Sequence, residues 1–480
     1  MAADASRTPL LFDPTAFETF VFLDRELHED GLVTLRYALD DELSFTEQLR
    51  LPVPHPLGGE ERHHAESLLA LLHWVAGVSY FKLAAPPLVA FEGESPPGAV
   101  AALLEALYSE GLGEFAYTNR LEHLPRPRFS VAGDELAGAS DPGAGSDAPG
   151  RADARAASSA QTGPPNPLPE RVLVPVGGGK DSAVAIEIVR RSGLPSTLFS
   201  IGDAPPIART VTAAGLPWLR ARRELDPQLG RLNASGALNG HVPVTAIVTA
   251  AALLCACLNG YDTVAMANER SASVGNLSWD GVEVNHQFSK SLRVERLLDD
   301  ALHELRSPVG AFSVLRPASE LAIARAFARL DAYHQAFTSC NTIFRLDPEL
   351  RGTSWCCECP KCRFVFLALA PFTSPQQLTG IFGRDLLDEE HQFEGFALLC
   401  AAGGHKPFEC VGEEQESLAA IRLLAREERW RGHAVLERLI AEVLPRHEPQ
   451  EGEPAAVLEL SEDHEVPEAL MADVRALLGA

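Results

Sequence analysis

A glycine-rich turn between a predicted strand and a predicted helix constrains the fold of this chain most. Residues 172–176 are a short apolar run typical of a buried strand, and residues 182–191 have the pattern of a helix. The strand is followed at once by three glycines, which let the backbone come close to a ligand. Ligands bind at the carboxyl ends of parallel strands, where exposed N–H groups and the helix dipole attract an anion. We therefore expect a phosphate-binding loop at this turn.

The side chains of this loop suit a phosphate in different ways. Lys180 adds positive charge, and Ser182 offers a hydroxyl to a phosphate oxygen. Asp181 would repel a bare phosphate, so its natural roles are to orient the loop or to hold Mg²⁺. The spacing departs from the usual P-loop and from the dinucleotide fingerprint, and a glycine-rich turn without a ligand is the alternative. The predicted loop residues are Gly177, Gly178, Gly179, Lys180, Asp181 and Ser182.

Alternating strands and helices predict an α/β fold for residues 170–446. Apolar strands are expected at 172–176, 197–201 and 263–266, with helices at 182–191 and 243–258. Such alternation implies a parallel sheet covered by helices on both faces. We expect this part to be the catalytic domain, with a cysteine-rich insert.

The rest of the chain divides into three segments. Residues 1–130 predict a small α+β domain, with strands at 17–23, 31–39 and 43–51 and helices at 64–78 and 100–109. Residues 131–169 are dense in Ala, Gly, Ser, Pro and Asp, so they bury too little apolar surface to fold and predict a disordered linker. Residues 447–480 form an acidic C-terminal tail with a helix at 468–478.

The charge of the chain limits its partners. The 480 residues carry a formal net charge of −25, which repels nucleic acid and anionic lipid headgroups. An anionic substrate would therefore need a local cationic pocket. No run of 18 uncharged apolar residues occurs, and residues 1–13 lack the basic-then-apolar layout of a signal peptide. We expect a cytoplasmic protein without a membrane or nucleic-acid partner.

Two groups of polar residues are candidates for substrate binding. Residues 239–245 open an apolar helix, where a side chain could face an anion, although an ordinary helix cap is the alternative. Residues 268–276 follow the strand at 263–266, and residues 285–291 come soon after. Their arginine and lysine suit carboxylate or phosphate. The predicted substrate-binding residues are His241, Thr245, Arg270, His286 and Lys290.

A compact cysteine cluster predicts a metal site. Cys356, Cys359 and Cys362 have C-x2-C-x2-C spacing, and Cys340 lies sixteen residues before the first of them. Four thiolates suit tetrahedral Zn²⁺. Nine cysteines with such clustering indicate metal or catalytic chemistry in a reducing compartment rather than a disulfide framework. The alternative is that one or two of these thiols are catalytic or merely packed.

Residues 405–412 offer candidates for proton transfer. His405, Glu409 and Cys410 lie in a turn beside Pro and Gly, and their side chains can exchange protons. A loop histidine without a role is the alternative. His286 and Lys290 are second choices for the same task.

The loop at 177–182 resembles the signature Ser-Gly-Gly-x-Asp-Ser of the PP-loop ATP pyrophosphatases, with Gly177 in place of the first serine. The resemblance implies a Rossmann-like parallel sheet and cleavage of ATP to AMP and pyrophosphate, while a substrate is activated as an adenylate. It also implies adenine contacts at the next strand, around Ser200. The glycine at the serine position removes one hydroxyl from the pyrophosphate site. The cysteine cluster is similar to the zinc knuckle of the PP-loop enzyme that makes 7-cyano-7-deazaguanine.

Several motifs in order resemble the family of UDP-N-acetyl-α-D-muramoyl-L-alanyl-L-glutamate epimerases. They lie at 80–86, 177–182, 240–246, 285–290, 359–362 and 405–412. The resemblance implies inversion of the terminal L-glutamate of a UDP-linked muramoyl dipeptide, with ATP and Mg²⁺ as cofactors, in peptidoglycan synthesis. The rivals are an adenylating amide or nitrile synthase, a regulator that only binds nucleotide, and a tRNA-modifying PP-loop enzyme, which the negative charge disfavours.

Overall fold

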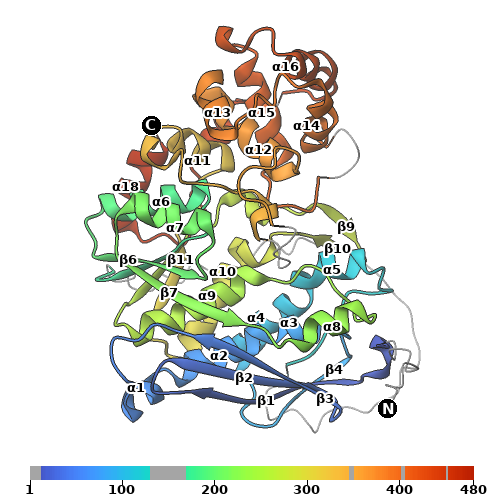
Figure 1. Cartoon of the computed structure of the whole chain (residues 1–480), viewed down its shortest axis with the longest axis vertical. Coiled ribbons are helices and arrows are strands. Elements are labelled where there is room, and N and C mark those ends of the chain that lie inside the picture. The colour runs from blue at the N-terminus through green and yellow to red at the C-terminus, as the bar shows by residue number, and fades with distance from the viewer. Residues whose placement is uncertain (1–11, 130–168, 345–350, 402–405, 450–451, 480) are drawn as a thin grey trace, which may run out of the picture.

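The computed structural model describes residues 12–129, 169–344, 351–401, 406–449 and 452–479, and its central feature is a nine-stranded mixed sheet (Figure 1). The strand order is β11-β8-β5-β6-β7-β3-β2-β1-β4. The strands are β1 (Thr19–Leu27), β2 (Leu32–Leu39), β3 (Leu43–Arg50), β4 (Leu88–Phe91), β5 (Val172–Pro175), β6 (Ser196–Ile201), β7 (Trp218–Glu224), β8 (Thr263–Met266) and β11 (Gly310–Ser313). A separate hairpin pairs β9 (Leu277–Trp279) with β10 (Val282–Val284).

The parallel half of the sheet contains the predicted phosphate loop. Strands β11, β8, β5, β6 and β7 are mutually parallel, which confirms the α/β prediction. From β5 the chain adds β6 and β7 on one side and then crosses to add β8 and β11 on the other. This reversal puts a topological switch point beside β5, where ligands bind in open α/β sheets. The loop at 177–182 is therefore at the position that such sheets use for binding.

The N-terminal strands continue the same sheet. Strand β3 pairs antiparallel with β7, and Leu49 lies opposite Arg223. Arg223 donates two hydrogen bonds, of 2.7 and 3.0 Å, to the buried carboxylate of Glu47 across this joint. The three strands predicted between residues 17 and 51 are present, although β1 runs on to Leu27 past a bulge between Phe22 and Arg25. The predicted domain border near residue 130 stays a prediction.

Helices cover both faces of the sheet. Along the strands side chains alternate, so Val172 and Val174 face one hydrophobic cluster and Leu173 faces the other. Helices α6 (Lys180–Arg191), α7 (Pro205–Ala214) and α11 (Glu320–Phe327) pack in the first cluster. The second cluster holds α2 (Glu66–Ala76), α3 (Val78–Phe81), α4 (Gly98–Tyr108), α9 (Val244–Leu258) and α10 (Leu292–Glu304). Shorter helices α1 (Gly59–His64), α5 (Gly113–Thr118) and α8 (Gln228–Ala234) complete this part.

The C-terminal part is helical. Its orange helices, from α12 to α16, lie at the upper end of Figure 1, and the red helix α18 lies lower, beside α6. Its helices are α12 (Pro360–Leu369), α13 (Pro375–Phe382), α14 (Phe393–Leu399), α15 (Glu414–Leu424), α16 (Ala434–Arg438), α17 (Ala455–Leu458) and α18 (Glu468–Leu478). Helix α18 has the bounds predicted from the sequence and packs on α6 and α11. Its Val474 and Leu478 are fully buried, so this acidic segment contributes to the core.

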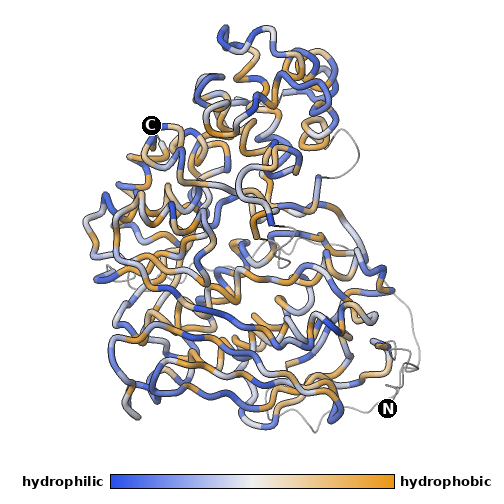
Figure 2. The backbone as a smooth tube through the Cα atoms, in the orientation of Figure 1, coloured by the Kyte–Doolittle hydropathy of each residue, from blue (hydrophilic) through white to orange (hydrophobic). Residues whose placement is uncertain are grey.

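Figure 2 shows hydrophobic stretches concentrated in the elements that pack against one another, while many outward-facing loops are hydrophilic. In the described residues no helix combines the length and the apolar character that a membrane crossing requires. The predicted linker at 131–169 lies almost wholly outside the described residues, which resume at Pro169.

Candidate active site

The glycine loop is reachable from the surface and needs glycine at its second position. Gly177 is exposed, and its N–H donates a 3.0 Å hydrogen bond to the hydroxyl of Ser182. Gly178 has φ +82°, and a Cβ there would lie 2.7 Å from the backbone N of Ile207. Helix α6 begins at Lys180, two residues before the predicted start, because Gly179 takes the extended conformation of an N-cap.

Lys180 is oriented into the protein rather than toward solvent. Its side chain is fully buried, and its ammonium group pairs with the carboxylates of Asp181 and Glu320. Burial disfavours the ammonium charge, but the two carboxylates outweigh it and raise the pKa of Lys180. The lysine therefore ties the loop to the start of α11. Asp181 keeps part of its carboxylate exposed.

Two further lysines connect the loop with the segment around Cys410. Lys361 donates from Nζ to the backbone oxygen of Cys410 and lies 3.6 Å from the second oxygen of Glu320. Lys290, in the short turn Phe288–Lys290, donates a 3.2 Å hydrogen bond to the side chain of Gln287. Its charge is near enough to the Cys410 thiol and the Asp181 carboxylate to lower the pKa of both. Burial works against its charge, but Cys410 and nearby carboxylates outweigh it and raise the pKa of Lys290. The glycine loop and the Cys410 thiol therefore belong to one electrostatic cluster.

Two side-chain amides hydrogen-bond to the backbone on either side of Cys410. Asn276 donates a 2.8 Å hydrogen bond to the oxygen of Pro407, and Gln287 donates one of 3.4 Å to the oxygen of Val411. Burial would raise the pKa of the Cys410 thiol, but Lys290, a hydrogen bond with His286 and the charge of Lys361 outweigh it and lower this pKa to about 7. These neighbours therefore favour the thiolate form of Cys410 over the thiol.

His286 is paired with a carboxylate from the N-terminal part of the chain. Its Nδ1 hydrogen-bonds to Glu114 in α5. Burial disfavours the imidazolium, but hydrogen bonds to Cys410 and Glu114 outweigh it and raise the pKa of His286 to about 9. The ring of His241 lies 4.4 Å away, centroid to centroid. Burial, together with the charge of His286, lowers the pKa of His241 to about 4.

The structure thus brings together five of the predicted site residues, namely His241, His286, Lys290, Glu409 and Cys410. Glu409 accepts a hydrogen bond from Asn341, and burial raises the pKa of its carboxyl group. His405, the third proton-transfer candidate, lies outside the described residues.

Three predicted binding residues lie apart from this cluster or are already engaged. Arg270 donates to the backbone oxygens of Val457 and Glu459, at 3.2 and 3.1 Å. Ser200 is buried, and its hydroxyl donates to the oxygen of Gly202 and accepts from the indole of Trp218. Thr245 lies in the first turn of α9, half-buried.

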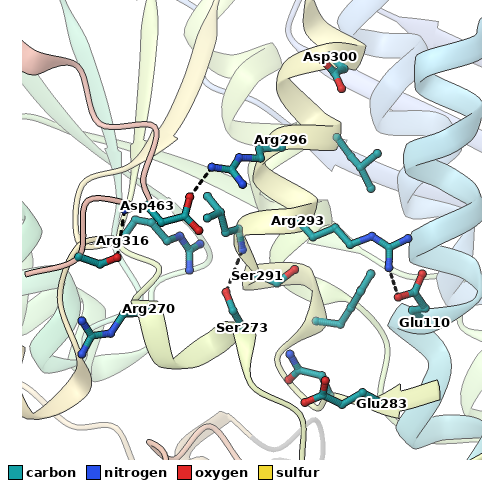
Figure 3. A pocket seen from close by; sticks show the side chains of 15 residues that line it. Glu110, Arg270, Ser273, Glu283, Ser291, Arg293, Arg296, Asp300, Arg316 and Asp463 are labelled. Carbon is teal, nitrogen blue, oxygen red and sulfur yellow. Dashed lines mark hydrogen bonds and ion pairs between the residues drawn. The ribbon is translucent and has the colours of Figure 1, made fainter. Parts of the chain in front are cut away.

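Arg270 lines a separate pocket of about 610 Å³ (Figure 3). Asn285, Phe288 and Ser291 border this pocket, and they come from the same segment as His286 and Lys290. Figure 3 shows Arg293 directed at Glu110 and Arg296 at Asp463, and both arginines are ion-paired. Because these charges are balanced, the pocket by itself does not define an anion site.

The four predicted thiolate ligands lie close together. The sulfurs of Cys340, Cys356, Cys359 and Cys362 are all within 4.8 Å of one another, and two of these separations are 3.5 and 3.8 Å. Four sulfurs around a tetrahedral Zn²⁺ would be about 3.8 Å apart. Backbone N–H groups of Glu358 and Cys362 also point at these sulfurs, at 3.5 and 3.4 Å. The donor set and its spacing fit zinc.

Sequence reasoning missed three residues of the cluster: Glu114, Glu320 and Lys361. Glu114 is an isolated acidic residue in a short helix, and nothing in its neighbourhood distinguishes it from a solvated side chain. Glu320 is the first residue of α11, capped by Ser319, and in the sequence it marks no more than the start of a helix. Lys361 lies between Cys359 and Cys362, and the cysteine spacing predicts no function for this lysine.

Comparisons with known proteins identify two family models that match this chain. The family model described as the MurL N-terminal domain matches residues 11–314, and that of the MurL C-terminal domain matches residues 336–453. No solved structure matches this chain. The fold and the site define an α/β protein whose glycine loop adjoins a buried cluster of ionisable groups. The chain belongs to the MurL family.

Curated relatives extend the match over nearly the whole length. A protein of Xanthomonas oryzae pv. oryzae is 41% identical over 468 residues, which are 97% of this chain and 98% of the relative. A protein of Salinispora tropica is 46% identical over 85% of each chain. One of Micromonospora sp. is 44% identical over 85% of this chain and 87% of the relative. All three carry the name UDP-N-acetyl-alpha-D-muramoyl-L-alanyl-L-glutamate epimerase.

Proposed function

We propose that this protein inverts the terminal L-glutamate of UDP-N-acetylmuramoyl-L-alanyl-L-glutamate, in the synthesis of peptidoglycan precursors. The names of the relatives support this substrate. The observation that carries the proposal is the contact between the glycine loop and the Cys410 segment. Lys180 of the loop and Lys361 share the carboxylate of Glu320, and Lys361 also donates to the backbone oxygen of Cys410. Activation of an acid and removal of its neighbouring proton can therefore take place side by side.

Activation is needed because a proton beside a free carboxylate is very hard to remove. The resulting carbanion would carry two adjacent negative charges. In our proposal the glutamate α-carboxylate attacks the α-phosphorus of ATP, and pyrophosphate leaves. The acyl-adenylate so formed lacks the carboxylate charge and accepts electron density as an enolate. Its Cα proton is taken on one face and another is returned on the opposite face. Water then releases AMP and the inverted acid, and the scheme needs no pyridoxal phosphate.

The glycine loop supplies the ATP site in this proposal, as a PP-loop of the ATP pyrophosphatase type. Its exposed N–H groups and the N-terminus of α6 would hold the pyrophosphate end. The partly exposed carboxylate of Asp181 suits Mg²⁺. The half-buried Lys290 adds cationic charge that Lys180, paired inside the protein, does not offer to solvent. Zinc at the four cysteines would have a structural role, because all four positions of the ion would be filled.

Cys410 is the proton-transfer residue that the geometry favours most. Lys290 and His286 stabilise its thiolate, and the residue is half-buried. Glu409 precedes it and is the second candidate. We place the reaction in the cytoplasm, and the charge of −25 argues against a nucleic-acid partner.

The proposal is tested by supplying the purified protein with ATP, Mg²⁺ and the UDP-linked dipeptide. We expect AMP, pyrophosphate and, after acid hydrolysis, D-glutamate. In D₂O the product should carry deuterium at Cα. AMP formed together with an amidated or nitrile product would indicate the rival synthase. Absence of pyrophosphate under all these conditions would reject the proposal and favour a regulator that only binds nucleotide.

A further inference from the structure

A carboxylate from the N-terminal part of the chain completes the cluster around Cys410. Glu114 and His286 are 172 residues apart in sequence and share a hydrogen bond through Oε2 and Nδ1. Both side chains are mostly buried, with 14% and 13% of their surfaces exposed. The backbone N–H of His286 donates a 3.0 Å hydrogen bond to Asn276, whose amide also holds the Cys410 segment at Pro407. The imidazole is therefore fixed at Nδ1 by Glu114, and Cys410 is near enough to affect the pKa of the ring.

The order carboxylate, imidazole, thiol has a known physical consequence. A carboxylate at one ring nitrogen stabilises the imidazolium form, and an imidazolium beside a thiol stabilises the thiolate. The ring of His241 lies against that of His286. A protonated His286 disfavours protonation of His241, because the two positive charges would repel each other. Lys290 and Lys361 face the same thiol from two other elements, and Glu409 lies beside it in the chain. Glu114 is the group that faces Nδ1 of His286.

We infer that Glu114 is a positioning residue, which holds His286 in its protonated form and orientation so that Cys410 stands ready as a thiolate. The inference depends on the proposed function in one respect, the use of the Cys410 thiolate in catalysis. There the thiolate would take the Cα proton and become a thiol. The N-terminal part of the chain thereby completes the site, since α5 delivers Glu114 to a cluster that otherwise comes from residues after 180.

The rate at which iodoacetamide alkylates Cys410 tests the inference without substrate. Mass spectrometry of the peptide that carries Cys410, with fragment ions to distinguish it from Cys400, gives this rate from about pH 5 to about pH 9. We expect a midpoint near pH 7 in the unmodified protein. In Glu114→Gln the midpoint should rise by about one pH unit, so alkylation below both midpoints becomes about tenfold slower. Glu105→Gln is the matched control, because Glu105 pairs with Arg128.

A double-mutant cycle asks whether Glu114 acts through His286. His286→Gln should raise the midpoint as well, and Glu114→Gln should add little to it. Fully additive shifts would overturn the inference, as would a Glu114→Gln protein with an unchanged midpoint. If the variants do not fold, ¹⁵N-histidine spectra of the unmodified protein decide. His286 should stay protonated up to about pH 9, and a neutral ring at pH 7 would contradict our inference.

A metal ion is the competing explanation, because ligand atoms of Glu114, His241 and His286 lie within 4.8 Å of one another. A second metal equivalent that is lost in Glu114→Gln, beyond the one expected at the cysteines, would overturn the inference. A measurement of epimerase activity shows whether the inference about Glu114 or the proposed function has failed. A shifted alkylation midpoint in a protein without epimerase activity would keep the role of Glu114 and reject the function. Epimerase activity with an unshifted midpoint would do the reverse.

Discussion

At the scale of single residues, identical side chains behave differently because their surroundings differ. Cys400 is fully buried among apolar residues, and burial raises the pKa of its thiol to about 12. Cys410 is surrounded by Lys290, Lys361 and His286, which lower the pKa of its thiol to about 7 despite burial. Reactivity in this chain is therefore a property of the neighbours of a cysteine, and the substitutions below separate these contributions.

Replacing Cys410 by serine should abolish inversion but leave ATP cleavage. A serine hydroxyl at neutral pH is a far poorer base than a thiolate, so we expect epimerisation to fall by at least about 100-fold. Pyrophosphate release should remain, because the glycine loop is untouched. The measurements are D-glutamate after hydrolysis and pyrophosphate from the same reaction. Cys257→Ser, at a half-buried cysteine of α9, is the control. Full epimerase activity in Cys410→Ser would exclude this thiol as the base.

Replacing Lys290 by methionine should shift the pH dependence of epimerisation upward. Loss of the ammonium charge removes the largest favourable influence on the thiolate, so Cys410 needs a higher pH to ionise. We expect the acid side of the pH–rate profile near pH 7 in the parent, and it should move up by at least about one unit in the variant. Rates measured across the pH range check this expectation. A profile that only drops in height would show that Lys290 does not tune the thiol.

At the scale of elements, the turn from β5 to α6 depends on glycine for two different reasons. Gly178 combines φ +82° with close contact to the first turn of α7, where a Cβ would lie 2.7 Å from Ile207 N. Gly193, at the end of the same helix, has φ +73° with open space around its Cα. The pair therefore separates backbone strain from steric overlap.

Gly178→Ala should destabilise the protein more than Gly193→Ala. We expect the φ penalty of about 1 kcal/mol in both variants, and at least about 1–3 kcal/mol more at Gly178 from the overlap. Thermal unfolding gives the stabilities, and pyrophosphate release should fall only in Gly178→Ala. Equal losses in the two variants would mean that the loop can move away from α7 at little cost.

The segment from Cys340 to Cys362 should bind about one zinc ion per chain. Elemental analysis of purified protein, before and after treatment with a chelator, measures the metal. Cys359→Ser should reduce the content, and it should also lower epimerisation, because Lys361 lies between two of the cysteines and holds the backbone of Cys410. The sulfur of Cys357 points instead at the oxygen of Phe382, so the Cys357→Ser protein should keep its metal. A ratio near zero in the parent protein would reject zinc.

At the scale of the whole molecule, distant parts of the chain share one body. The strands β1–β4 extend the sheet through the pairing of β3 with β7, and α18 closes the hydrophobic cluster beside α6 and α11. The cluster around Cys410 takes Glu114 from α5, His286 and Lys290 from the middle, and Lys361 from α12. The site exists only when these parts are packed together.

Truncation of one side chain in α18 tests this view of the C-terminal segment. Leu478 is fully buried, and Leu478→Ala should cost about 2–5 kcal/mol of the free energy of unfolding. Leu398, which is 41% exposed, provides the control, and Leu398→Ala should cost less than about 1 kcal/mol. Thermal unfolding measures both. Equal midpoints for Leu478→Ala and the parent would show that α18 is dispensable for the core.

Some features of this protein could be predicted from its sequence because they are encoded within a few residues. The strand before Gly177, the helix after it, the helix at 468–478 and the cysteine spacing all rest on local periodicity, backbone freedom or ligand geometry. The α/β class followed from the alternation of such segments. Their boundaries moved by a few residues where caps decided them, as at Gly179.

The tertiary structure alone decided which of these segments meet. The antiparallel joint of β3 with β7, the burial of Lys180 against Glu320 and the hydrogen bond between Glu114 and His286 each connect residues that are more than 100 positions apart. Many apolar faces in this sequence could pack against one another, so local pattern does not specify the partner. The packing of the whole chain selects one arrangement, and that arrangement places a carboxylate of α5 against an imidazole and a thiol.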